Sequence, residues 1–486
     1  MPKIKQIIAD EKNITFVLDS PIRQTSTIEI FTPSVNHTSV DLVSVDIFGT
    51  RFSIPRFADS KDRLTYHFVT EFEGPSYVID ITSKYTYNYP TTPTKKGLRA
   101  ANIQHGVNLA ALNDSFSLGS HHDSIDLDMP DLMSVFPYEH SDTYIYNDET
   151  YYINLDKLDM LDEETRILTA HDVTLTITLL VYADVKDKKL IPYVRHPDYD
   201  GMGKVAMFNV VTDEGMNYYE AICHFLAERY TRPDRKYGNI TGIIIGNEAS
   251  VQGAWCNAGD KTMQQFVGQY MTAMRVAWQV GVKFWSNWRV YASFDNHWNE
   301  AFVPQLDKKF YKGREMLEYM IEVSHTDGDF GWHIAHHPYT SNLINAAFWN
   351  DEDATFDYKT SPVVSFKNLV LLVHFVKIPQ NMYKGKPRVI ILSEQGFNGV
   401  NRTMEFTQAL AYAKSYKVVM AYPEVESVIY HSQFDHPTEE HGLQLGIWRT
   451  ETVGDVEQDA RPIYNIMKYI DQPVKSQPDK KLYELY

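Results

Sequence analysis

Two glutamates stand directly after short apolar runs, where a buried strand would end. Glu248 follows GIIIGN, and Glu394 follows VIILS. Paired carboxylates about 5–5.5 Å apart are the geometry for glycoside hydrolysis with retention, in which one group is the acid and then the base while the other attacks the anomeric carbon. A single strand-end glutamate can equally bind a loop. The two in the same register predict carboxylate chemistry.

The elements that must position these glutamates form a repeating pattern. From about residue 98, strand and helix segments alternate, and several strands are continuous apolar runs, as expected where both faces of a parallel sheet are covered. Eight strand–helix units predict an α/β fold, a (β/α)₈ TIM barrel whose active site lies at the carboxyl ends of the strands. Glu248 and Glu394 then follow strands four and seven. The predicted strands are 106–112, 174–183, 205–211, 239–246, 289–295, 332–337, 388–393 and 425–431.

The first 95 residues follow a different pattern. Short segments with alternating apolar residues, such as 13–20 and 64–72, are separated by turn residues about every ten positions. This pattern is typical of an all-β sandwich. We therefore expect an immunoglobulin-like or carbohydrate-binding-like domain at 1–95 and a catalytic barrel at 98–486, with a proline-bearing boundary at 86–97. The first domain could bind carbohydrate or serve only to pack against the barrel.

Other polar and aromatic residues near the predicted strand ends are candidate sugar contacts. Each could also cap a turn or pack at the barrel rim. Trp448 in GIWR could be a stacking platform, since aromatic rings pack against apolar faces. The remaining candidates are Asn113 after strand one, Asn296, His297 and Trp298 after strand five, His336 and His337 at strand six, and His431 and Gln433 after strand eight.

The residues around the two glutamates resemble clan A of the retaining glycoside hydrolases, which have a (β/α)₈ barrel. IIIGNE, IILSEQGFN, HHPY and GIWR are similar, more narrowly, to a bacterial family long catalogued as a domain of unknown function. The resemblance implies that Glu248 is the acid/base and Glu394 the nucleophile. It implies that Asn247 bonds the sugar 2-hydroxyl, that Tyr339 touches the nucleophile, and that the substrate is β-linked. Unlike some relatives, the chain shows no arginine near the end of predicted strand two.

Composition excludes several classes of partner. The net charge of −17 disfavours nucleic acid, which is bound largely through Lys and Arg, and anionic membrane surfaces. The longest apolar runs are about half the length that spans a bilayer. The apolar stretch at the N-terminus is too short for a signal peptide. We expect a cytoplasmic protein if the chain is complete, and a secreted one if a signal has been removed. The predicted partner is a carbohydrate substrate, and the sequence does not predict an oligomeric state.

No cofactor or metal is expected. Strand one would need a His-x-His pair for a hydrolytic metal barrel, and it ends in LAALND instead. The chain lacks the glycine-rich phosphate loops and the GxSxG elbow, and Cys223 and Cys256 have no CxxC spacing. Two alternatives remain open: a non-catalytic carbohydrate-binding protein on a decayed barrel, and a metal hydrolase.

Overall fold

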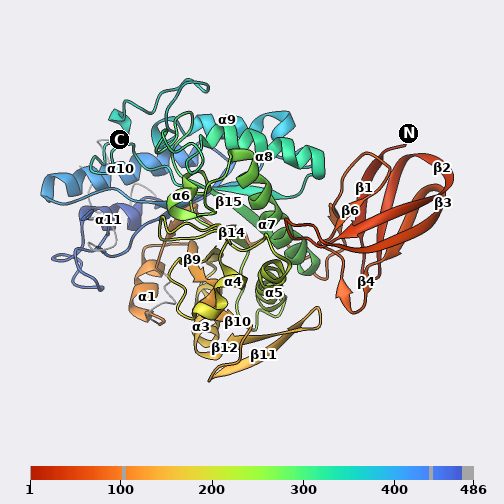
Figure 1. The fold of residues 1–486 in the computed structure, drawn as a ribbon. Helices are drawn as coiled ribbons and strands as arrows, with labels where there is room; N and C mark the ends of the chain where they lie inside the picture. The colour runs from red at the N-terminus through yellow and green to blue at the C-terminus, as the bar shows by residue number, and fades with distance from the viewer. Residues whose placement is uncertain (1, 101–105, 437–441, 473–486) are drawn as a thin grey trace.

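A closed parallel barrel of eight strands forms the centre of the protein. The structure, a computed structural model, describes residues 2–100, 106–436 and 442–472 (Figure 1). Around the barrel the strands follow chain order, which confirms the predicted TIM-type architecture. They are β8 (Lys96–Leu98), β9 (His122–Asp128), β13 (Thr174–Leu180), β14 (Gly242–Ile245), β15 (Arg289–Phe294), β16 (Trp332–His336), β17 (Ile390–Gln395) and β18 (Val425–Tyr430).

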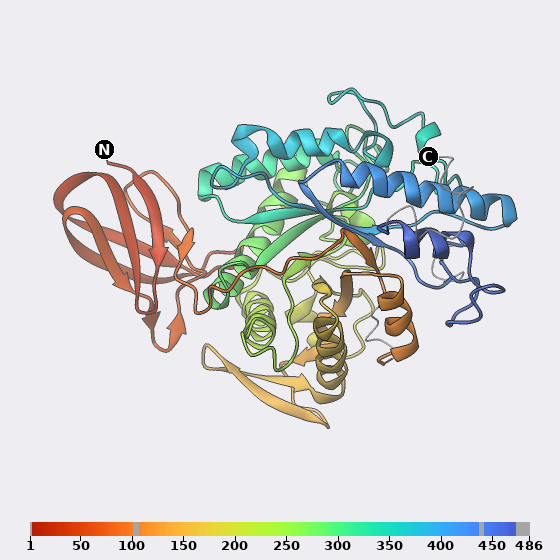
Figure 2. The same cartoon turned by 180° about the vertical axis from the view of Figure 1, so that it is seen from behind.

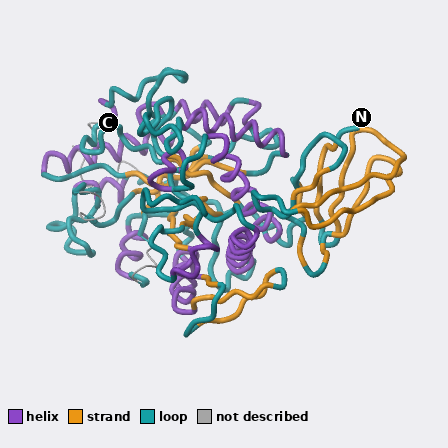
Figure 3. Tube along the Cα trace, viewed as in Figure 1, coloured by secondary structure: helices purple, strands orange, loops and turns teal. Residues whose placement is uncertain are grey.

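Helices surround the barrel and bury the outer faces of its strands (Figures 2 and 3). All seven residues of β13 and all four of β14 are buried, as expected where both faces of a parallel strand are covered; β14 is a run of apolar residues, whereas threonines alternate with apolar residues in β13. Inside the barrel, Ile244, Tyr291, Ala335 and Ile391 form a layer with one residue from each of β14 to β17. The covering helices are α3 (Leu155–Ala170), α5 (Asp213–Tyr230), α7 (Met263–Phe284), α8 (Gly313–Asp327), α9 (Val370–Lys377), α10 (Arg402–Met420) and α11 (Pro462–Tyr469).

Two predicted barrel strands are wrong. Residues 106–112 do not form a strand: α1 (Leu109–Ser117) begins there, capped by the Asn108 side chain, which accepts from the Ala111 N–H at 3.1 Å. Residues 205–211 make only isolated bridges. The missed strands are β8, which is very short, and β9, whose sequence HDSIDLD mixes polar with apolar residues. Polar side chains of β9 are bound inside the barrel wall, as where Ser124 bonds Thr178 at 3.1 Å, so no apolar run marks the strand.

The N-terminal part is all-β, as predicted. Its five-stranded sheet contains β1 (Ile4–Ala9), β2 (Asn13–Phe31), β3 (Ser39–Pro55), β6 (His67–Val69) and β7 (Asp80–Ile81), and β4 (Phe57–Ala58) pairs with β5 (Lys61–Asp62). Phe16 and Phe52 stack in its core with their ring centres 4.9 Å apart. The sandwich arrangement of two sheets and the boundaries at 95 and 98 stay predictions.

This N-terminal part packs along the side of the barrel, against α5 and α7 (Figure 1). Ser34 donates to Asp213 at 2.6 Å, Thr65 donates to Glu220 at 2.9 Å, and Gln279 donates to the Val78 carbonyl at 2.9 Å. Ser34, Thr65, Glu220 and Gln279 are buried, so these bonds pair polar groups away from water and stabilise the contact between the two parts.

The remaining elements lie in the connections. A three-stranded sheet of β10 (Met133–Ser134), β11 (Ser141–Tyr146) and β12 (Glu149–Asn154) is inserted after β9. The short helices are α2 (Met129–Leu132), α4 (Ile191–Val194) and α6 (Gln252–Trp255), with 3₁₀ turns at η1 (Lys188–Leu190), η2 (Ala249–Val251), η3 (Phe348–Asn350), η4 (Phe366–Asn368) and η5 (Pro379–Asn381). Within the described residues, no helix has the length and apolar character to cross a membrane.

Candidate active site

Glu248 and Glu394 lie at the same rim of the barrel. Glu248 follows β14 and Glu394 lies near the end of β17, the fourth and seventh barrel strands in chain order. The predicted strand numbers are correct for these two, because the two missed strands offset the two wrong ones. Their side chains are 14% and 23% exposed, so both carboxylates can still meet a ligand that enters from solvent.

The turn that presents Glu248 is strained and held from β15. Glu248 has φ 41 and ψ 60, the left-handed region, and the preceding Gly246 has φ 64. For a residue with a Cβ this conformation costs about 1–2 kcal/mol. The Glu248 N–H donates to Ser293 Oγ at 2.9 Å, and its carbonyl accepts from the Val251 N–H at 2.8 Å. Strain that surrounding contacts enforce is typical of functional sites.

Asp295 holds the next part of the same turn. Its carboxylate accepts from the Ser250 hydroxyl at 2.6 Å and contacts Nδ1 of His297. Burial lowers the pKa of His297, but the Asp295 carboxylate outweighs burial and raises it. Ser293 in β15 and Asp295 just after it thus hold the Glu248 turn at two points.

The Glu248 carboxyl is held in an environment that favours its protonated form. Burial raises its pKa because desolvation disfavours the charged state, and the nearby carboxylates of Asp295 and Glu394 raise it further. His337 opposes them: its Nδ1 lies 2.9 Å from Glu248 Oε1. The balance leaves the pKa of Glu248 raised, as a proton donor at neutral pH requires.

The Glu394 carboxylate has the opposite environment. Arg99 Nη1 donates to its Oε2 at 2.9 Å, and the Tyr339 hydroxyl donates to its Oε1 at 3.2 Å. Burial acts to raise the pKa, but His337, His431 and Arg99 outweigh burial and lower it to about 2. Glu394 is therefore ionised at neutral pH. Two carboxyl groups at one rim with pKa values moved apart is the arrangement that separates an acid from a nucleophile.

Arg99 was missed by sequence reasoning. It follows β8 directly, donates to Glu394, and forms an ion pair with Asp126 of β9. The sequence predicts no arginine near the end of strand two, and Arg99 does not contradict this, because it follows the first barrel strand. Because the first strand was predicted at 106–112, Arg99 was not placed at a strand end, and the only signal was an arginine after the short run KGL.

Five of the predicted contact residues lie at this rim. His337, Tyr339 and His431 interact with the carboxylates, and His297 is held by Asp295. Asn247 is half-buried next to Glu248, and its side chain makes no hydrogen bond to another described residue. Its amide therefore remains available to a ligand.

Three other predicted contacts are buried supports behind the rim. Asn296 donates to the Tyr339 carbonyl at 2.9 Å, and His336 bonds the Val364 carbonyl at 3.0 Å. Burial lowers the pKa of His336 to about 4, so it is neutral. Trp298 is 2% exposed and donates to the Tyr358 carbonyl at 3.0 Å. None of these three side chains is placed to touch a sugar directly.

The last three predicted contacts are corrected by the structure. Asn113 does not follow a barrel strand, since it lies exposed on α1. Gln433 and Trp448 are buried and donate to Asp114 at 2.9 and 2.8 Å. Trp448 is fully buried and cannot be a stacking platform in this structure. Asn113 was misplaced because 106–112 is not a strand, and Gln433 and Trp448 because they pack against Asp114 of α1.

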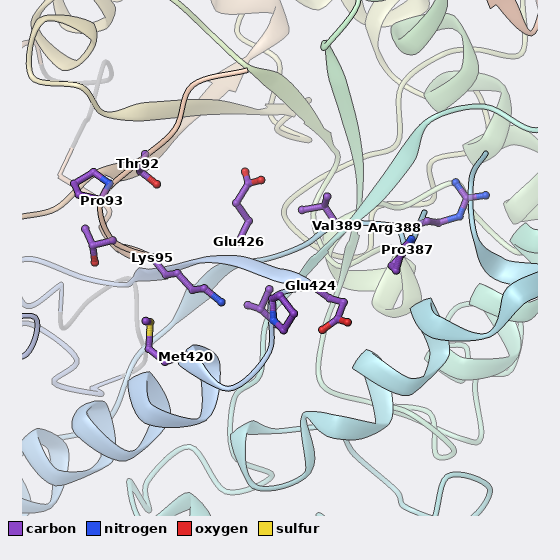
Figure 4. Close-up of a pocket in the computed structure, with 12 residues that line it drawn as sticks. Thr92, Pro93, Lys95, Pro387, Arg388, Val389, Met420, Glu424 and Glu426 are labelled. Carbon is purple, nitrogen blue, oxygen red and sulfur yellow. The ribbon is translucent and has the colours of Figure 1, made fainter. Parts of the chain in front are cut away.

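A cavity of about 580 Å³ lies at the other end of the barrel (Figure 4). Its walls come from the segments that precede β8, β17 and β18, so it opens at the amino ends of the strands. Charged groups there already have partners: Glu426 pairs with Arg289 at 2.6 Å, and Arg388 pairs with Asp329 at 2.7 Å. This cavity is separate from the carboxylate rim. In the described part of the chain, no three His, Cys, Asp or Glu side chains gather so that they could hold a metal ion.

Comparisons with known proteins give one family and a general likeness. Residues 88–485 match the DUF5722 family model, described as a family of unknown function. No curated protein matches the sequence. Three solved structures illustrate the structural likeness. The β-glucosidase of Pyrococcus furiosus has a TM-score of 0.48 and 11% identity over 77% of this chain and 85% of its own. A family 1 β-glucosidase from Thermotoga maritima has a TM-score of 0.42 and 13% identity over 69% and 79%. A calcium-binding mutant of Bacteroides uniformis β-glucuronidase 2 has a TM-score of 0.44 and 10% identity over 96% and 49%, so this chain spans about half its length.

Proposed function

The chain belongs to the DUF5722 family, and we propose that it is a retaining glycoside hydrolase that cleaves O-glycosidic bonds of a β-linked oligo- or polysaccharide. The observation that carries this proposal is the opposed environment of Glu248 and Glu394 at one barrel rim. Burial and neighbouring carboxylates raise the pKa of Glu248, while Arg99, His337 and His431 lower that of Glu394. Retaining hydrolysis needs one protonated and one ionised carboxyl.

In the first step, Glu394 attacks the anomeric carbon and a covalent glycosyl-enzyme forms. Glu248 gives its proton to the glycosidic oxygen as the bond to the leaving sugar breaks. Arg99 and Tyr339 each donate to one oxygen of Glu394, so they fix the orientation of the attacking carboxylate. The Asn247 amide, which makes no hydrogen bond to another described residue, bonds the 2-hydroxyl of the same sugar in this proposal, a contact that strengthens in the transition state.

In the second step, Glu248 takes a proton from water, which attacks the anomeric carbon and releases Glu394. The returning negative charge on Glu394 is again stabilised by Arg99. His337 lies at the Glu248 oxygen, where it stabilises the ionised form that exists between the two steps. Configuration is retained because each step inverts it once.

The test is product release from aryl glycosides and from polysaccharides, with Glu394→Gln beside the wild type. We expect wild-type turnover with retention of anomeric configuration by NMR, and a loss of about 10⁴-fold or more in kcat for Glu394→Gln. Glu248→Ala should spare substrates with good leaving groups, which need little acid help. Near-wild-type activity of Glu394→Gln would refute the assignment.

We also propose that residues 1–95 are a sandwich-like packing domain and that residues 98–486 form the catalytic domain. Support comes from the bonds of Ser34 to Asp213 and of Gln279 to Val78 across the contact. Deletion of 1–95 is then expected to give insoluble barrel. Soluble, active barrel with weaker polysaccharide binding would instead favour a carbohydrate-binding domain.

A further inference from the structure

A second cavity, of about 560 Å³, lies at the carboxyl end of β13. We call it the basic pocket, and its wall includes Tyr182, Asp184, Lys188, Arg195, Tyr199 and Lys204. β13 pairs with β14, the strand that leads to Glu248. The pocket therefore lies toward the same end of the barrel as the two carboxylates.

The wall of the basic pocket is tied to the segment that follows Glu248. The Lys204 N–H donates to the Ala254 carbonyl at 3.1 Å. Gly203 has φ +76, and a Cβ there would lie 2.3 Å from the same carbonyl oxygen, so only glycine allows this close approach. The position of the pocket relative to the Glu248 turn is thus set by direct backbone contact.

Two cations in the basic pocket form no ion pair with any residue that the structure describes. Among the described residues, no ion pair involves Arg195 or Lys204, whereas Lys188 pairs with Asp184 at 2.7 Å. The neighbouring acids are already engaged, Asp198 by Lys261 at 2.7 Å and Asp200 by Lys309. In a chain with a net charge of −17, unpaired cations beside a cavity mark a place where anions are favoured.

Two tyrosines and a held guanidinium line part of the basic pocket. The Arg195 guanidinium lies over the Tyr199 ring at 4.7 Å, and its Nη1 donates to the Ala183 carbonyl at 3.0 Å. These contacts hold the guanidinium plane and leave further N–H donors for a planar or tetrahedral anion. Tyr182 and Tyr199 add amphipathic rings against which a sugar can pack.

We propose that the basic pocket binds an anionic substituent of the glycan, a sulfate ester or a uronic carboxylate, so that the substrate of this barrel is an acidic polysaccharide. This inference rests on the proposed glycoside hydrolase function for its substrate class. Arg195 and Lys204 are the residues that recognise the charge, and the catalytic carboxylates act on a sugar further along the same chain.

The experiment measures binding to the full-length Glu394→Gln protein by calorimetry at low ionic strength. The probes are two matched pairs: a sulfated galactan with its desulfated product, and a polyuronate with its carboxyl-reduced product. We expect tighter binding of the anionic member of one pair, and the pair that shows the contrast identifies sulfate or carboxylate. Adding Arg195→Ala and Lys204→Ala should weaken that binding at least ten-fold, and added salt should weaken it as well. Lys189→Ala, an exposed lysine next to Lys188, is the matched control and should change Kd less than two-fold.

Equal binding of charged and neutral members, no binding of either anionic probe, or an unchanged Kd in the double variant would overturn the inference. Turnover of neutral aryl glycosides by the wild type tests the proposed function separately. If that turnover fails on every substrate while the charge contrast holds, the hydrolase proposal falls and the anionic glycan site remains.

Discussion

His337 contacts the Glu248 carboxyl with one ring nitrogen and the strand of Glu394 with the other. Nδ1 lies 2.9 Å from Glu248 Oε1, and Nε2 lies 3.2 Å from Oγ of Ser393. Burial lowers the pKa of His337, but Glu394 and Glu248 outweigh burial and raise it. One imidazole thus interacts electrostatically with both carboxyl groups, and its charge affects them in the same direction.

Replacing His337 should therefore move both limbs of the pH profile together. A cation lowers the pKa of Glu394 and of Glu248, so its loss in His337→Phe raises both. In the proposed mechanism, activity needs Glu394 ionised on the acid side and Glu248 protonated on the alkaline side. The bell-shaped profile of kcat/KM should shift to higher pH, with kcat reduced about 10²-fold or more. Ser393→Ala keeps the imidazole and should shift the profile much less; an unmoved profile in His337→Phe would contradict the coupling.

Replacing Arg99 should move the acid limb alone. Arg99 is one of the cations that lower the pKa of Glu394 to about 2, and it donates directly to Oε2. Arg99→Gln should raise the pH at which activity appears on the acid side and lower kcat about 10–10³-fold. The pH dependence of kcat/KM checks this. Arg99→Lys keeps the charge without the planar fork, so its acid limb should stay near that of the wild type while kcat falls.

Asp295 should affect the alkaline limb. Its negative charge raises the pKa of Glu248, and its carboxylate accepts from Ser250. In Asp295→Asn the charge is lost, so the pKa of Glu248 falls and the alkaline limb moves to lower pH. Ser250→Ala removes the same hydrogen bond but keeps the charge, so it should cost kcat without that shift. Identical profiles for the two variants would mean that Asp295 acts only as a structural clamp.

Asp114 should be important for stability. It is 8% exposed and accepts from Gln433, Trp448 and Tyr464 at 2.9, 2.8 and 2.9 Å. Asp114→Ala leaves three buried donors without this acceptor, at about 1–3 kcal/mol for each group that stays unpaired. We expect the free energy of unfolding in urea to fall by about 3 kcal/mol or more. Asn113→Ala, its exposed neighbour on α1, should change it by less than about 0.5 kcal/mol.

Most barrel strands were predictable because they are local apolar runs. Most residues of β13 to β18 are buried, and strands covered on both faces are rich in apolar residues, as in GIII of β14 and IIL of β17. β8 and β9 were not predicted. β8 is only three residues long, and β9 carries polar side chains that form hydrogen bonds inside the barrel wall. Hydrophobic periodicity cannot reveal a strand whose polar side chains find partners only in the folded barrel.

The sequence by itself determined the identity and register of the two carboxyl groups. Glu248 and Glu394 each follow an apolar run, and parallel strands of a barrel bring their carboxyl ends to one rim. Only the tertiary structure decided the partners that raise the pKa of Glu248 and lower that of Glu394. Arg99 donates to Glu394 although the two lie 295 residues apart in the sequence. His337 contacts Glu248, whereas the adjacent His336 bonds the Val364 carbonyl instead. Trp448 is buried and donates to Asp114. Strand position follows from local burial, whereas a pKa depends on every charge that folding brings near, and those charges come from distant parts of the chain.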